Sequence, residues 1–179
     1  ISMLSNNTEV HKLVQGHFNT SAELWGLAVH PTMPVFATCC DDMTVRLWNS
    51  RFLQPIAGGI AHLGAKVRAV AFNSDGTQIA AATYDGKIHV LDSDLKQEVA
   101  LVTVGTAWIQ CLKYSPDGKY LACGAHDNMI SLLETKAYSC SKKLKGHHSY
   151  ITAIDFSKCG GYLQSASGDY ELLFWDCHS

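Results

Sequence analysis

The sequence predicts an all-β fold made of four copies of one unit, each a small sheet of four antiparallel strands. Three observations support this prediction. An acidic turn residue followed by a strand returns at a regular interval, a second strand pattern returns in step with it, and turn-forming residues lie between them. No stretch of useful length has the 3.6-residue period of a helix. The units are expected at about residues 8–51, 52–94, 95–136 and 137–179.

The first landmark is an acidic residue followed by an apolar strand. Its four copies begin at Asp42, Asp85, Asp127 and Asp169, at intervals of 43, 42 and 42 residues. Apolar residues at the fourth and sixth positions give the period of two that is typical of a half-buried strand. The copies read DMTVRLWN, DGKIHVLD, DNMISLLE and DYELLFWD.

The second landmark is a strand that comes before each of these copies. Its matched positions, Leu27, Val70, Leu112 and Ile154, are again 43, 42 and 42 residues apart. The turn sequences SDG, SPDG and KCGG then close a hairpin with the next strand. That next strand reads VFATCC, QIAAATY, YLACGAH and YLQSASG, and looser fourth strands are expected near 8–15, 52–58, 97–103 and 140–145.

The third landmark is a Gly-His pair or a variant of it, at 16–17, 61–62 and 146–147, with Gly-Thr at 105–106. A period of about 40–45 residues with four short strands, Gly-His and Trp-Asp is typical of a blade of a WD-repeat β-propeller. The sequence therefore predicts a partial propeller of four blades, because radial closure usually takes more.

Both ends of this partial propeller are predicted to be open sheet edges, which proteins usually cover. Residues 8–14 form a strand without a unit, and the last unit ends at its third strand. Either neighbouring blades of a longer parent chain complete the ring, or a second copy of this chain does. We favour the parent chain, because the first residue is Ile1 rather than a methionine.

Within each blade we expect a buried hydrogen-bonded chain that runs from the turn acid through His and a Ser or Thr to Trp. Such a chain satisfies polar groups that would otherwise cost roughly 1–3 kcal/mol each when buried. The third blade lacks most members and should be the least polar inside. The expected members are His17, Cys40, Asp42 and Trp48 in blade one; His62, Thr83 and Asp85, with Leu91 for Trp, in blade two; Asp127 in blade three; and His147, Ser167, Asp169 and Trp175 in blade four.

Composition argues against several classes of function. The 179 residues carry a net charge of −2, so no basic field indicates nucleic acid, and no apolar run is long enough for a membrane span. Seven cysteines without a CxxC motif favour reduced core residues in a cytosolic protein over disulfides. No HxxxH occurs, so no metal or cofactor is expected. The His and Asp pairs recur at structural positions, which favours packing over catalysis.

Partner binding is expected on the propeller face formed by the loops before the first strands and before the turn acids, since core packing does not determine those residues. Trp, Tyr and Arg dominate binding hot spots, so Trp108 and Tyr150 are the favoured candidates. The candidate set is Glu23, Trp25, Asp41, Lys66, Arg68, Tyr84, Trp108, Gln110, His126, Tyr150 and Thr152, with Gly168 at the matching place in the last unit.

Three stretches carry a resemblance to a known family: ELWGLAVHP, HDN at 126–128 and SGDYE at 167–171. Together they resemble the echinoderm microtubule-associated protein-like family, and best match part of the second of its two joined propellers. The resemblance implies a non-catalytic scaffold bound to tubulin and microtubules, in the cytoplasm, the cytoskeleton and possibly the cilium or axoneme. A generic WD-repeat adaptor that assembles protein complexes is the alternative. The basic run of Lys142, Lys143 and Lys145 is interpreted as a solvated edge rather than a contact with an acidic tubulin tail.

Overall fold

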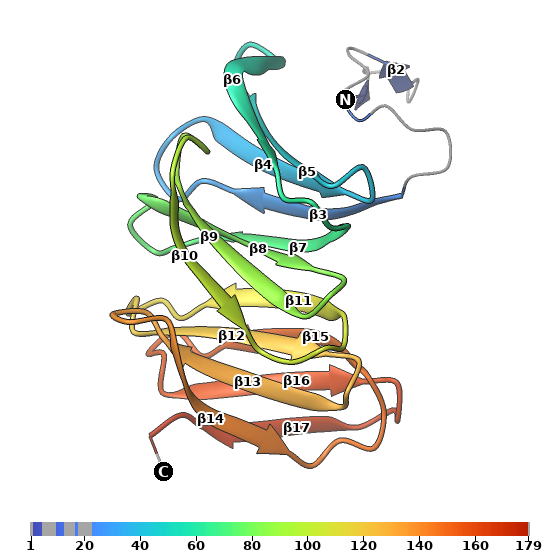
Figure 1. Cartoon of the computed structure of the whole chain (residues 1–179), viewed down its shortest axis with the longest axis vertical. Helices are drawn as coiled ribbons and strands as arrows, with labels where there is room; N and C mark the ends of the chain where they lie inside the picture. Colours follow the sequence, from blue (N-terminus) through green and yellow to red (C-terminus); the bar gives the residue numbers. More distant parts are fainter. Residues whose placement is uncertain (1, 5–9, 13–16, 18–22, 179) are drawn as a thin grey trace.

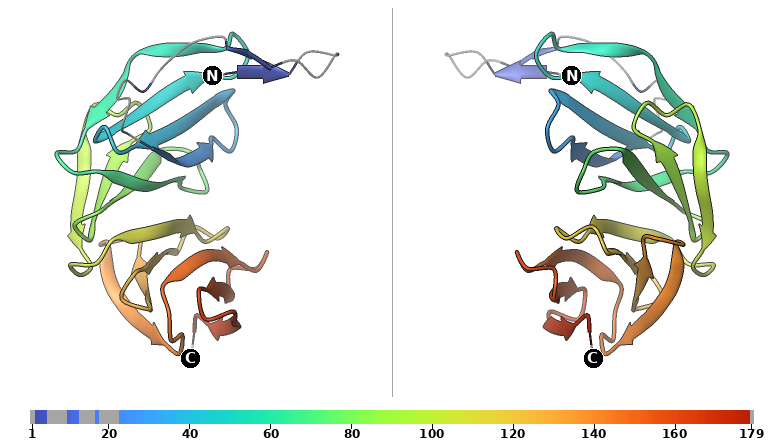
Figure 2. Two further views of the ribbon diagram at one scale, coloured as in Figure 1. Left: turned by 90° about the vertical axis from the view of Figure 1, so that its right-hand side faces the viewer. Right: turned by 90° about the vertical axis from the view of Figure 1, so that its left-hand side faces the viewer.

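The computed structural model describes residues 2–4, 10–12, 17 and 23–178, and within these residues every regular element is a strand. Four antiparallel sheets follow one another in chain order, from blue to red in Figure 1. Figure 2 shows that the sheets lie along an open arc rather than a closed ring. The predicted partial propeller is thus confirmed. No helix in the described part of the chain is long and apolar enough to cross a membrane.

In each blade the strands pair in sequence order. The first strand forms one edge of the sheet, and in the four-stranded blades the fourth strand forms the other edge. The last blade has three strands, as the sequence predicts. Blade one contains β3 (Leu24–Val29), β4 (Val35–Cys40), β5 (Thr44–Asn49) and β6 (Gln54–His62); blade two contains β7 (Val67–Phe72), β8 (Gln78–Thr83), β9 (Lys87–Asp92) and β10 (Glu98–Thr103); blade three contains β11 (Ile109–Tyr114), β12 (Tyr120–Ala125), β13 (Met129–Glu134) and β14 (Ser139–Lys145); and blade four contains β15 (Ile151–Phe156), β16 (Tyr162–Ser167) and β17 (Leu172–Asp176).

The N-terminal strands do not belong to a blade. β1 (Ser2–Leu4) pairs with β2 (Val10–Lys12) in a separate two-stranded sheet. The strand predicted near 8–15 therefore exists in its middle part, but it pairs with β1 and not with a blade. The remainder of that prediction falls on residues outside the described part of the chain.

The turn acid holds the backbone between the second and third strands of a blade. In three blades its Oδ1 accepts the N–H of the residue two positions later, at Thr44, Met129 and Glu171. The residue between has a positive φ in all four blades: Met43, Gly86, Asn128 and Tyr170 lie between 64° and 78°. This conformation suits Gly and Asn and costs other residues roughly 1–2 kcal/mol, so the acid stabilises a strained turn.

Consecutive blades pack face to face through matched positions. Two residues of each first strand face the preceding blade, and in the first blade these are Leu27 and Val29, which are 68% and 71% exposed. In the other three blades the same positions are at most 9% exposed. They are Val70 and Phe72, Leu112 and Tyr114, and Ile154 and Phe156.

The last blade shows the converse. Leu172 and Phe174 on β17 are 57% and 69% exposed, whereas Ile130 and Leu132 at the matching positions of β13 are fully buried against blade four. The outer edge of β17 pairs with no strand in the described part of the chain. The arc therefore ends in two apolar faces that carry the residues of an ordinary blade interface.

All seven cysteines are free thiols. The prediction of core cysteines holds for Cys39, Cys40, Cys123 and Cys177, which are buried, and Cys111 is half-buried. It is wrong for the remaining two, at 140 and 159, which are exposed because they lie on an outer strand and in a turn. Burial raises the pKa of Cys39 and of Cys123 to about 12, so these thiols are unreactive near neutral pH.

Candidate functional site

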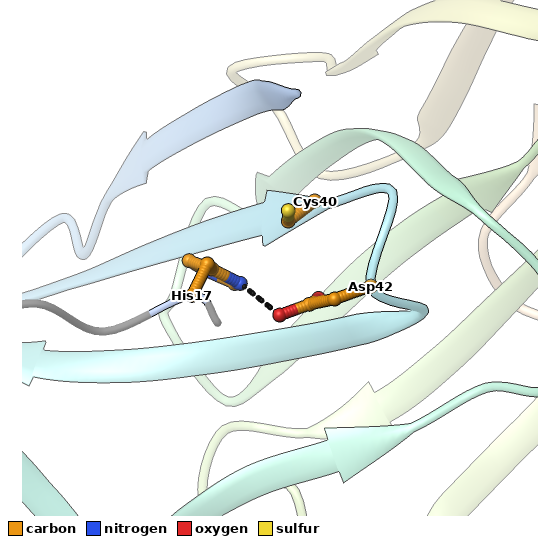
Figure 3. A group of neighbouring side chains, drawn as sticks. All are labelled: His17, Cys40 and Asp42. Atoms are coloured by element: carbon orange, nitrogen blue, oxygen red, sulfur yellow. Dashed lines mark hydrogen bonds and ion pairs between the residues drawn. The ribbon is translucent and has the colours of Figure 1, made fainter. Parts of the chain in front are cut away.

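Blade one contains a complete hydrogen-bonded chain. The Nδ1 atom of His17 lies 2.8 Å from Asp42 Oδ2, and its Nε2 atom lies 2.8 Å from Thr38 Oγ1. The indole N–H of Trp48 donates to the same hydroxyl at 2.8 Å. Figure 3 shows His17 pointing at Asp42, with Cys40 close by on β4. The hydroxyl of this chain is thus Thr38, and the prediction of Cys40 in that place is wrong.

Blade four repeats the arrangement. His147 Nδ1 lies 3.2 Å from Asp169 Oδ2, and its Nε2 lies 2.7 Å from Ser165 Oγ, which also accepts the N–H of Trp175 at 2.8 Å. The predicted hydroxyl, Ser167, is not part of this chain and donates instead to the carbonyl of Ser149. The backbone N–H of His148 adds a second donor to Asp169 at 2.7 Å.

Strand register explains both corrections. Side chains two residues apart point to the same face of a strand, so both candidate positions face inward. Trp48 pairs with Phe36, and Thr38 is the diagonal neighbour that a long side chain can reach. Cys40 lies two residues farther along the strand. The alternation in the sequence could not separate these two positions, whereas the register does.

Blade two lacks the chain because its histidine is one residue out of place. His62 is exposed, whereas 42-residue steps back from His147 lead to Gly105 and then to Leu63, which packs against the core. Asp85 instead accepts from Thr83 Oγ1 at 2.6 Å and pairs with the ammonium of Lys87. The prediction of His62 as a member of this network is therefore wrong.

Blade three lacks the chain as well, and at these positions it is as apolar as blade two, which has Leu63, Ala81 and Leu91 there. Cys123 takes the place of the hydroxyl and Leu133 that of the Trp, and both are at most 1% exposed. Asp127 keeps its hydrogen bond to the N–H of Met129 and so retains its role in the turn.

The network is organised around an ionised acid and a neutral imidazole. Burial works against ionisation of Asp42, but the hydrogen bonds from Thr44 and His17 together outweigh it and hold its pKa below the usual range. Burial lowers the pKa of His17, although Asp42 opposes this. At Asp169 burial again opposes ionisation, and hydrogen bonds from the N–H groups of His148 and Glu171 lower the pKa. The acids thus remain charged acceptors near neutral pH.

Two clusters in these chains have the residue types of a metal site. They are His17 with Cys40 and Asp42, and His147 with Asp169 and Glu171, each set having ligand atoms within 4.8 Å of one another. Both ring nitrogens of each histidine, however, already hold the acid and the hydroxyl. Burial also raises the pKa of Cys40, which disfavours the thiolate that a metal needs. The geometry is that of a structural network.

The predicted binding residues gather at a second place, where one blade meets the next. In every blade the residue before the turn acid donates its backbone N–H to the carbonyl of the residue before the first strand, at 2.9–3.1 Å. This bond brings two residues together at the same corner of each blade. The pairs are Glu23 and Asp41, Lys66 and Tyr84, Trp108 and His126, and Tyr150 and Gly168.

These corners also touch across the blade junctions. Between blades one and two, Lys66 Nζ lies 3.2 Å from Asp41 Oδ2. Between blades two and three, Tyr84 stacks on Trp108 with 4.8 Å between ring centroids, and between blades three and four His126 stacks on Tyr150 at 4.6 Å. Trp108 and His126 stack within blade three, so four rings form one continuous column.

Arg68 extends this column toward blade one. Its guanidinium carbon lies 3.9 Å from the ring centroid of Trp25 and 5.3 Å from that of Trp108. We call Trp25, Arg68, Tyr84, Trp108, His126 and Tyr150 the rim row. Two other predicted residues, Gln110 on β11 and Thr152 on β15, have no ring contact or ion pair with the rim row among the described residues.

A family profile described as the echinoderm microtubule-associated protein second beta-propeller matches residues 24–179. The chain belongs to this family. The match begins at the first residue of β3, so the four blades of this chain lie within it, while β1, β2 and His17 lie before it.

Individual relatives agree with this family membership. The chain is 38% identical over 176 residues to echinoderm microtubule-associated protein-like 2 of Homo sapiens, and 39% identical over 170 residues to echinoderm microtubule-associated protein-like 4 of Xenopus laevis. It is also 38% identical over 181 residues to the 77 kDa echinoderm microtubule-associated protein of Strongylocentrotus purpuratus. The alignments cover 96%, 93% and 98% of this chain but 26%, 18% and 26% of these relatives. The chain spans about a quarter of their length or less.

Proposed function

We propose that the protein is a non-catalytic, microtubule-associated scaffold that binds its partners through propeller surfaces in the cytoplasmic cytoskeleton. The observation that carries this proposal is the match to the family's second propeller across all four blades. The relatives are named as microtubule-associated proteins. The structure supports a non-catalytic role, because each His and Asp pair is hydrogen-bonded within a blade.

We further propose that neighbouring blades of the same polypeptide cover the two end faces of the arc. Leu27 and Val29 at one end, and Leu172 and Phe174 at the other, occupy positions that are buried at every internal junction. Exposed apolar faces of this kind indicate a missing interface. A second copy that meets the first end to end is the alternative, and molar mass from light scattering separates the two. A stable species of twice the chain mass would favour the second copy.

Cosedimentation of the full chain with stabilised microtubules, at low and at high salt, tests the main proposal. We expect the protein to pellet with microtubules, and we expect the double variant Trp108→Ala, Tyr150→Ala to pellet less while it remains folded. The matched control is Tyr162→Ala, which changes an exposed aromatic residue away from the rim row. A protein that stays in the supernatant at both salt concentrations would contradict the microtubule proposal.

The rim row also favours a second candidate, an adaptor that docks protein partners other than tubulin. Trp25, Tyr84 and Tyr150 are exposed by 38–44%, so three large aromatic residues of the rim row are accessible to a partner. Loss of microtubule pelleting together with retention of partner binding through the rim row would favour the adaptor. Location in the cilium, which the sequence resemblance implied, stays a prediction that imaging of the tagged protein can test.

A further inference from the structure

Arg68 is a buried cation whose hydrogen-bonding capacity is largely unused. Its side chain is 7% exposed, and its Nε and Nη1 atoms have no hydrogen-bond partner among the described residues. Within the described part of the chain its one ionic neighbour is Asp41, with 3.4 Å between Nη2 and Oδ1, and this contact is not a hydrogen bond. Leaving buried donors unpaired is costly, and a charged donor costs more than a neutral one. Asp41 Oδ1 is also buried without a hydrogen-bond partner, but it lies beside Nη2, so Nε and Nη1 remain donors without an acceptor among the described residues.

The charges around Arg68 favour an anion as that acceptor. Lys66 and Arg68 both face the single carboxylate of Asp41. Burial and the nearby Arg68 lower the pKa of His126, so its ring is neutral near pH 7. Glu23 is the other acid at this corner, and it is exposed at the outer end. Asp41 is therefore the one buried acid beside Arg68 among the described residues, and Lys66 shares its carboxylate.

The surroundings of Arg68 also offer apolar contacts and a way in. Trp25 and Tyr84, whose ring centroids lie 3.9 Å and 5.6 Å from its guanidinium carbon, are 38% and 43% exposed. Because half-exposed rings can turn, a rotation of either one would open Arg68 to a ligand. Tyr150, 44% exposed at the far end of the column, extends the aromatic surface across three blades.

We propose that the rim row binds a peptide segment through one of its Asp or Glu side chains, whose carboxylate pairs with Arg68. Apolar side chains next to that acid lie on Trp25, Tyr84 and Tyr150. This pairing of a planar guanidinium with a carboxylate is a strong and directional contact, and it gives one of the two unused donors, Nε or Nη1, an acceptor. The inference rests on the proposed scaffold function and deepens it, because it names the chemistry of the partner segment without requiring that the partner be tubulin.

The test measures binding of a fluorescein-labelled decapeptide of alternating Glu and Phe to the full chain by anisotropy, with the Gln and Phe counterpart as the neutral control. We expect the Glu peptide to bind at least tenfold more tightly than the Gln peptide. Arg68→Met keeps the length of the side chain but removes the charge, and we expect it to weaken Glu peptide binding roughly tenfold or more, as for a lost charge-assisted hydrogen bond.

Three further variants keep the test decisive. Trp25→Ala changes a half-exposed ring, so it should stay folded and weaken binding of the Glu peptide. Lys96→Met removes a surface cation that pairs with Asp94, and it should leave binding unchanged. Arg68→Lys keeps the charge but not the planar fork, and it should bind with intermediate affinity. A thermal melt of each variant reports whether it is folded.

Two results would overturn the proposal. One is equal binding of the Glu and Gln peptides, and the other is equal loss of binding in Arg68→Met and Lys96→Met. Microtubule cosedimentation of the same variants separates this proposal from the function on which it rests. If wild-type protein and Arg68→Met pellet equally while the peptide fails to bind, the acidic-peptide site is wrong and the scaffold proposal stands. If peptide binding depends on Arg68 but wild-type protein does not pellet, the scaffold proposal fails alone.

Discussion

The indole ring of Trp108 and the imidazole ring of His126 lie 4.0 Å apart between centroids, with their planes 4° from parallel. Trp108 precedes the first strand of blade three and His126 follows the second, so this contact closes one end of the blade. The outer faces of the pair contact Tyr84 of blade two and Tyr150 of blade four. One pair within a blade thereby joins three blades.

Trp108→Ala should lower the free energy of unfolding by about 1–3 kcal/mol, because it removes ring contacts with both Tyr84 and His126 at about 0.5–1.5 kcal/mol each. Tyr150→Ala, at the end of the column, loses one ring contact and should cost about half as much. Urea unfolding followed by circular dichroism measures both. Equal costs for the two variants would argue against a column in which the middle ring contributes twice.

Ser165→Ala should destabilise the chain by about 1–3 kcal/mol, since it leaves both the imidazole of His147 and the indole N–H of Trp175 without their shared partner. Thr38→Val, which keeps the side-chain shape, should act in the same way in blade one. The control is Thr152→Ala, an exposed change that should stay within about 0.5 kcal/mol. If Ser165→Ala is as mild as the control, the network contributes no stability.

These hydroxyls mark the limit of what the sequence could predict. The 42-residue period located the strands, the turn acids and both Trp residues, because each recurs in the same frame. It could not distinguish Ser165 from Ser167, since both face inward, although the same count back from His147 reaches Leu63 and not His62. The choice between the two hydroxyls depends on the pairing of neighbouring strands, which the sequence pattern does not contain.

The candidate binding residues could likewise be named but not connected. Loop position predicted Tyr84, Trp108, His126 and Tyr150 as one surface set, and the structure stacks them in a column. Arg68 was in the same set, yet its burial between aromatic rings and its unused donors depend on distances between different blades. No pattern along a single strand contains that information.

Acidification should lower stability in two steps. Burial lowers the pKa of His17 and of His126 in the folded state, so the unfolded chain binds more protons. The stability that these groups contribute is present above pH 6.5 and is lost as the pH falls through their lower folded values. Asp42 has a folded pKa below its unfolded value, so its contribution is present above about pH 4 and is lost on further acidification.

The urea midpoint at pH 7.5, 5.5 and 3.5 measures these two steps. His17→Asn and His126→Asn should each reduce the drop between pH 7.5 and 5.5, and Asp42→Asn should reduce the drop between pH 5.5 and 3.5. His62→Asn, which changes an exposed histidine, serves as the control. A midpoint that rises between pH 7.5 and 5.5 would contradict the assignment.

Tyr170→Gly should stabilise the chain by up to about 1 kcal/mol. Tyr170 is fully exposed and has a φ of 65°, so glycine removes strain in the turn without removing packing. Gly86→Ala is the converse test, because a Cβ there would lie 2.4 Å from the carbonyl oxygen of Gly105 and should destabilise the chain. Thermal melts of the two variants should shift in opposite directions.

Leu132→Ala should cost about 2–5 kcal/mol as a buried core truncation, whereas Phe174→Ala at the matching position should cost less than about 0.5 kcal/mol in the chain alone. If further blades cover β17 in a longer polypeptide, the cost of Phe174→Ala should approach that of Leu132→Ala when both are made there. Chemical denaturation of the two proteins provides the comparison. An unchanged small cost for Phe174→Ala would show that this end face stays uncovered.

The packing of each blade on its immediate neighbours, β3 on β7, β7 on β11 and β11 on β15, has a kinetic consequence. Interactions that run in a line let a chain open from its ends, one unit at a time. Blades one and four each have one neighbour in the described arc, and blades two and three have two. Amide hydrogens should therefore exchange with solvent fastest in β5 and β17 and slowest in β8 and β12. The order in which the strands take up deuterium then identifies the most stable blades of the arc.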